Sequence, residues 1–162
     1  MNSNSGENNF ILARSQEHKL ILESLGDMEA CLKFSTADEL IENLKRIIET
    51  FKANLLKHQK LEELVIFSAG MQAVPTSTVT GLIIQLTREH GLFEATIDSI
   101  IDKMNFPCEG NQTRLMIQRD LERIITLIKK HSLNEVKNLF PLLSNNLKCR
   151  TLIDSLAATV QI

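Results

Sequence analysis

Four long segments with apolar residues at helical spacing constrain the fold of this chain most strongly. They cover about residues 9–33, 36–70, 75–105 and 111–139, with short breaks between them. Apolar residues that recur every three to four positions form one stripe along a helix. Signals for strands are nearly absent, because Val, Ile and Thr do not alternate with polar residues over any long stretch. The sequence therefore predicts an all-α fold.

The breaks between the segments carry signals for helix starts. Thr36 and Glu39 have the spacing of a capping box, and Pro75 followed by hydroxyl residues is typical of a new helix. Short connections place consecutive helices side by side in opposite directions. We therefore expect an up-down-up-down four-helix bundle. Leu115 is among the residues that we expect on its inner face.

The end of the chain predicts a short fifth helix. Apolar residues at helical spacing occur there at Leu147, Leu152, Ile153, Leu156 and Val160. This helix would cover one end of the bundle, and packing on a partner is the alternative. The expected organisation is a disordered tail over 1–9, the bundle over 10–143 and a C-terminal helical extension over 144–162.

Composition excludes several classes of function. The chain has 162 residues, which fits one domain, and its net charge of -2 offers no basic surface for nucleic acid. No apolar run is long enough to cross a bilayer, and the start "MNSNSGENN" lacks the features of a signal peptide. Cys31, Cys108 and Cys149 form no CxxC pair. We therefore expect a reduced, cytoplasmic protein with no membrane or nucleic-acid partner.

Histidines stand at unusual places in the four predicted helices. The chain has 4 His, one in each long segment, and each lies on the apolar stripe. Three of them are followed by Glu one helical turn later, as His58–Glu62, His90–Glu94 and His131–Glu135, and the fourth is His18. Residues at i and i+4 on a helix point in the same direction. Each pair therefore directs two donor groups at the core.

A single histidine of this kind would be an ordinary core residue with a hydrogen-bond partner. Three buried carboxylates are harder to explain, because neither Lys nor Arg falls on the inner stripe near them and an unpaired buried charge costs several kcal/mol. A bound metal cluster would supply the compensating charge. Four imidazoles and three carboxylates are too many donors for one tetrahedral zinc, and they include no thiolate for an iron–sulfur cluster. The donor set favours a dinuclear iron or manganese site.

The combined pattern resembles the hemerythrin-like proteins, also called the HHE cation-binding domain. Its parts here are His18, "HQKLE" at His58, His90 and "HSLNE" at His131, with "LFP" trailing the last motif. The resemblance covers about residues 10–143. It implies two iron ions bridged by Glu62, Glu135 and an oxo or hydroxo group. His18, His58, His90 and His131 would be the terminal ligands, and we rank manganese and zinc below iron.

One motif departs from the oxygen-carrying hemerythrins, which have His-x3-His on the third helix. This chain has "HGLFE" there, with Glu94 at the place of the second histidine. We expect Glu94 to bind metal directly, and the alternatives are a partner of a ligand or an empty position. As a ligand, it would add negative charge and favour ferric iron. That charge argues against simple reversible O2 carriage.

The resemblance implies a non-haem di-iron protein that binds or senses O2 or NO. The alternative is an enzyme-like or storage role, namely a di-iron peroxidase, the repair of iron centres, or iron storage. A third reading is a helical interaction protein whose site is empty or holds zinc. The chain contains no Tyr, which excludes a tyrosyl-radical enzyme.

Overall fold

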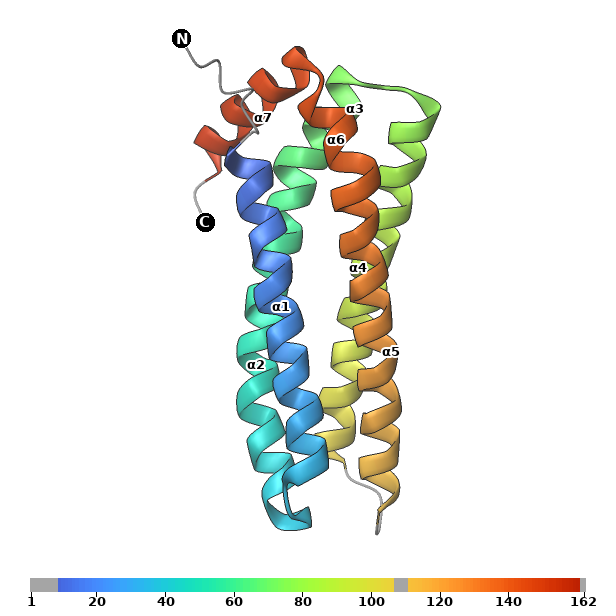
Figure 1. Cartoon of the computed structure of the whole chain (residues 1–162). Coiled ribbons are helices and arrows are strands. Elements are labelled where there is room, and N and C mark those ends of the chain that lie inside the picture. The colour runs from blue at the N-terminus through green and yellow to red at the C-terminus, as the bar shows by residue number, and fades with distance from the viewer. Residues whose placement is uncertain (1–8, 107–110, 161–162) are drawn as a thin grey trace.

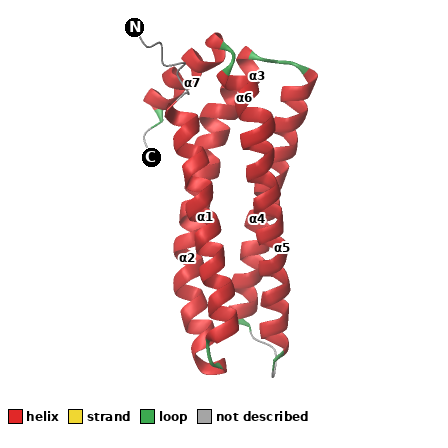
Figure 2. Ribbon diagram, in the orientation of Figure 1, coloured by secondary structure: helices red, strands yellow, loops and turns green. Residues whose placement is uncertain are grey.

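The computed structural model describes residues 9–106 and 111–160, and every regular element in this part of the chain is helical (Figure 2). The all-α prediction is confirmed for these residues. The long helices are α1 (Asn9–Phe34), α2 (Ala37–Leu61), α4 (Ser77–Asn105) and α5 (Gln112–Asn134). The shorter ones are η1 (Glu62–Phe67), α3 (Ser68–Ala73), η2 (Glu135–Leu139), α6 (Phe140–Ser144) and α7 (Leu147–Thr159). The predicted disordered tail lies outside the described residues except for Asn9, which is helical.

The four long helices lie side by side and run alternately down and up in Figure 1. Helix α1 packs against α2 and α5, and α4 packs against the same two helices. The apolar stripes of all four therefore face a shared interior, as helices with one apolar face require.

Helix starts follow the polar signals in the breaks. Thr36 is the N-cap of α2, and its hydroxyl donates to the Glu39 carboxylate at 2.8 Å instead of capping a backbone N–H. Helix α4 begins just after Pro75, and the Thr76 hydroxyl accepts a hydrogen bond of 3.2 Å from the Val79 N–H. Such caps satisfy N–H groups that a helix cannot pair internally.

The interior contains two apolar clusters with a polar layer between them. The first fills the space between the lower parts of the long helices in Figure 1, and the second lies at the end near α3, α6 and α7. Along α2, for example, Leu55 belongs to the first cluster, His58 follows it, and Val65 belongs to the second. Leu115 was expected to face inward but is 63% exposed, because α5 turns Thr113 and Ile117 toward the core instead.

Helices α2 and α5 both widen into a π-helical segment at a glutamate. The segment η1 begins at Glu62, and η2 begins at Glu135. π-Helical turns are rare and occur frequently at functional sites. Both segments begin at the same level of the interior, because Glu62 and Glu135 each lie within 3.5 Å of His18 Nε2.

Helix α7 packs on α3, α6 and η1 at one end of the long helices. Its Cys149 and Ile153 are fully buried in the second apolar cluster. Gly70 allows α3 to approach closely, since a Cβ there would meet Ile83 at 3.0 Å and Leu143 at 3.2 Å. Among the described residues, no helix combines the length and the apolar character that crossing a membrane requires.

Candidate metal centre

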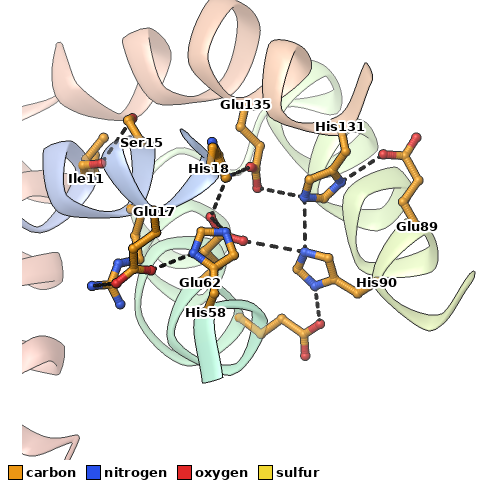
Figure 3. A network of polar contacts seen from close by, with 12 residues as sticks. Ile11, Ser15, Glu17, His18, His58, Glu62, Glu89, His90, His131 and Glu135 are labelled. Carbon is orange, nitrogen blue, oxygen red and sulfur yellow. Dashed lines mark hydrogen bonds and ion pairs between the residues drawn. The ribbon is translucent and has the colours of Figure 1, made fainter. Parts of the chain in front are cut away.

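The structure brings six of the seven predicted site residues together in the polar layer (Figure 3). They come from all four long helices and from the first residues of η1 and η2. All six are buried, with exposed fractions of 0% to 5%. They are His18, His58, Glu62, His90, His131 and Glu135.

Their donor atoms form two groups of four. The first metal position consists of His18, His58, Glu62 and Glu135, and the second consists of Glu62, His90, His131 and Glu135. Within each group the donor atoms lie within 4.8 Å of one another. Each position thus offers two imidazole nitrogens and two carboxylate oxygens. The two positions share both carboxylates, as a pair of neighbouring metal ions requires.

The distances between donors confirm that the groups meet at one place. Glu62 Oε1 lies 3.0 Å from His58 Nε2, and Glu62 Oε2 lies 3.5 Å from His90 Nε2. Glu135 Oε2 lies 2.9 Å from His18 Nε2, and Glu135 Oε1 lies 3.3 Å from His131 Nε2. Each carboxylate therefore reaches at least one histidine of each group, and Glu62 also lies 3.5 Å from His18 Nε2.

A second set of glutamates holds the outer nitrogens of three histidines. Glu17 Oε2 lies 2.7 Å from His58 Nδ1. Glu63 Oε1 lies 2.7 Å from His90 Nδ1, and Glu89 Oε2 lies 2.9 Å from His131 Nδ1. A carboxylate only accepts, so Nδ1 carries the hydrogen, and in the neutral ring that binds a metal Nε2 directs its lone pair toward the centre. This arrangement fixes the ring and increases its basicity as a metal ligand.

His18 differs from the other three histidines. Its Nδ1 is buried and has no hydrogen-bond partner among the described residues. Its Nε2 points at the shared carboxylates like the others. The outer carboxylates thus support three of the four rings.

The charges in this layer depend on one another. Burial opposes protonation of His18, but the close, negatively charged carboxylates of Glu135 and Glu62 outweigh it and raise its pKa to about 9. Burial likewise opposes protonation of His58 and His131, and their carboxylate neighbours raise the pKa of each to about 9. Burial alone would raise the pKa of Glu62, yet the facing histidines hold it well below its usual range. Without a metal, the histidines carry the compensating charge.

Phenylalanine rings pack on three of the four histidines. Phe140 stacks on His18 with ring centroids 6.4 Å apart, and Phe67 stacks on His90 at 5.6 Å. Phe93 meets His131 edge to face at 5.1 Å. These rings exclude bulk water from the polar layer and lower its local dielectric.

Glu94 is the one predicted ligand that the structure does not bring to the site. It is exposed on α4, and the residue before it, Phe93, is 1% exposed and occupies the inner face next to His90. Helix α4 is α-helical throughout Ser77–Asn105, without a π-helical segment at this level. The expectation that Glu94 binds metal directly therefore differs from the structure. The argument that its charge favours ferric iron no longer applies, because it required Glu94 to be a ligand.

The sequence interpretation missed the outer glutamates Glu17, Glu63 and Glu89. Each is adjacent in sequence to an inner donor, yet each contacts a histidine on the next long helix. The available signal was the doubled pattern "EH" at His18 and His90 and "EE" at Glu62. Which histidine each one supports depends on how the helices pack, which spacing along one helix does not reveal.

The inner donors fit a metal pair better than they fit one another. The carboxylate oxygens of Glu62 and Glu135 are fully buried and accept no well-aligned hydrogen bond, although Nε2 atoms stand 2.9 to 3.5 Å away. Among the described residues, each ion-pair partner of these two glutamates is a histidine. Apart from a contact of 3.2 Å between the Nε2 atoms of His90 and His131, the inner donors thus face a common point without well-aligned hydrogen bonds to one another, as is typical of ligands.

Comparison with known proteins assigns the chain to a family. Searches of curated proteins and of solved structures returned no significant match. The family model of the Hemerythrin HHE cation binding domain matches residues 14–143, which includes all six inner donors. This chain belongs to the hemerythrin family of HHE cation-binding domains.

Proposed function

We propose that this protein is an up-down-up-down four-helix bundle that binds a pair of iron ions and takes up O2 or NO there. The observation that supports this best is the set of six buried donors, divided into two positions that share Glu62 and Glu135. The metal-binding unit would span residues 10–143, and residues 144–162 would form the helical extension that covers one end.

The donor set favours iron. Each position offers two imidazole nitrogens and two carboxylate oxygens, a mixture that suits iron or manganese. Among the described residues no thiolate contributes, although Cys31 and Cys149 are free. Free thiols fit the reducing cytoplasm that we propose for the protein. A single tetrahedral zinc ion would occupy only one position and leave the two histidines of the other position unused.

The surroundings favour a small ligand. An iron pair supplies electrons and open coordination positions to a diatomic molecule. The chain's own residues supply the rest. The outer glutamates hold the ring of each of three histidines, and Phe67, Phe93 and Phe140 surround the layer with apolar surface. Apolar surroundings accommodate an uncharged diatomic gas more readily than a charged substrate.

Metal reconstitution tests the proposal. The metal-free full-length chain would be loaded anaerobically with Fe(II), and its metal content measured after gel filtration. We expect two iron ions per chain and, after exposure to O2 or NO, a stable coloured adduct. No bound metal, or a single ion unaffected by changes in the shared glutamates, would contradict the proposal.

The same preparation separates the alternatives. Rapid turnover of peroxide with a reductant would favour a di-iron peroxidase over a binding protein. Iron accumulation well beyond two ions per chain would favour storage. A chain that takes up zinc but not iron would favour a structural role.

A further inference from the structure

The two halves of the molecule carry matching residues at the metal centre. Helices α1 and α2 contribute the pattern "EH" and then "HQKLE", and helices α4 and α5 contribute "EH" and then "HSLNE". Contacts match too. The pair His18–His58 and the pair His90–His131 each have ring centroids 4.8 Å apart. A Phe nine residues after each of His58 and His131 stacks on the lone histidine of the other half.

The outer glutamates obey the same symmetry in one pair. Glu17 precedes His18 and supports His58, while Glu89 precedes His90 and supports His131. The histidine of the second helix in each half therefore has a carboxylate at Nδ1. The two halves are equivalent in this respect.

The match between the outer carboxylates of the two halves ends at one position. Glu63 follows Glu62 and supports His90, whereas Val136 follows Glu135 and cannot support His18. The Nδ1 atom of His18 is correspondingly buried without a partner among the described residues. Val136 and Phe140 line a surface hollow of about 410 Å³ that reaches Ser15, one turn from His18 on α1. The side chain at 136 thus faces α1 near the histidine that lacks support.

The half of the site that contains His18 also borders a hollow in the surface. A hollow of about 290 Å³ between α1 and α2 is lined by Glu17 and His58 themselves. The hollow therefore brings solvent close to His58, one of the histidines of this half. Weaker support of a ligand and nearby solvent both favour faster metal exchange.

We propose that the two metal positions are unequal, and that the first metal position, which contains His18, binds its ion more weakly because Val136 stands where the other half has Glu63. This inference rests on the proposed function. Loss of a supporting carboxylate typically lowers the affinity of a metal site by about 10- to 100-fold. We expect a difference of that size between the two positions. Val136 and Glu63 act through a histidine and are positioning residues.

The test is an anaerobic titration of the metal-free full-length chain with Fe(II), in competition with a colorimetric chelator. The native protein should show two binding constants that differ by about 10- to 100-fold. V136E should tighten the weaker constant by about tenfold or more and leave the tighter one unchanged. E63Q should weaken the tighter constant instead. Both positions are solvent-accessible at the helix surface, so neither change threatens folding.

A matched control separates the position of the charge from its presence. Asn138 is exposed, so N138E adds the same charge nearby on η2 and should change neither constant by more than about twofold. Two equal constants in the native protein, or an equal effect of V136E and N138E, would overturn the inference while leaving two-metal binding intact. No metal binding in any variant would overturn the proposed function as well.

Discussion

Helices α1 and α4 bury a different residue after their histidine than helices α2 and α5 do. In α1 and α4, the residue three positions after the histidine is buried, Ile21 in one and Phe93 in the other. In α2 and α5, the residue four positions after it is buried, and it is the shared glutamate. Both glutamates stand at the start of a π-helical segment, which α1 and α4 lack. A His-x3-Glu motif therefore does not by itself carry its glutamate into the core.

Removal of a shared carboxylate should have the largest effect on metal binding. Glu62 belongs to both metal positions, so E62Q should remove a charged donor from each. We expect the loss of both iron ions, with an affinity decrease of well over about 100-fold, because an amide neither carries charge nor bridges two cations well. Metal analysis after reconstitution measures this. Retention of one tightly bound ion would show that the two positions do not share Glu62.

The carboxylates that α2 and α5 bury should also control the metal-free protein. The pKa values of His18, His58 and His131 are raised from 6.5 to about 9 by neighbouring carboxylates, of which Glu62 acts on all three. A raised folded-state pKa contributes stability that is complete below the unfolded value and is lost as pH rises through the folded value. The melting temperature of the metal-free chain should therefore fall by roughly 5 °C or more between pH 6.5 and 9.

Metal loading should weaken this pH trend, because metal ligands must be deprotonated. Binding at neutral pH should release protons, and buffers of different ionisation enthalpy would reveal them in calorimetry. A metal-free chain whose stability rises steadily over pH 6.5 to 9 would contradict the charges described here. The depressed pKa of Glu62 places its own contribution at acid pH, outside this window.

Substitution of the outer glutamates of α1 and α4 should have a smaller effect on iron affinity. Glu17 and Glu89 occupy matching places and support the histidines of α2 and α5. We expect E17Q and E89Q each to lower iron affinity by about tenfold at one position only, since the ring keeps a weaker hydrogen bond to the amide. Competition titration measures both constants. The two variants should affect different positions, and an effect on the same constant would contradict the division into halves.

Sequence spacing predicted the helices and the burial of the six inner residues, because both depend on local periodicity. A histidine on an apolar stripe must enter the core, whichever helix it meets there. The π-helical segments had no comparable signal, since one widened turn changes the direction of side chains without changing their order. The outer glutamates depend on contacts between helices, such as Glu63 with His90, across 27 residues of chain. The prediction that Leu115 faces inward was wrong for a related reason. Packing between helices decides which face of α5 turns toward the core near the start of that helix.

Substitution of Glu94 should have the smallest effect on iron affinity and stability. It also compares α4 with α2 most directly. E94Q makes the same chemical change as E62Q, at the same spacing from a histidine. Glu94 is exposed, and α4 turns Phe93 to the inner face at that level. Iron content should stay at two ions, affinity should change by less than about twofold, and stability should change by less than about 0.5 kcal/mol. Titration and thermal unfolding measure these quantities. A tenfold loss of affinity in E94Q would mean that α4 rotates about its axis when metal binds and brings the third glutamate to the site.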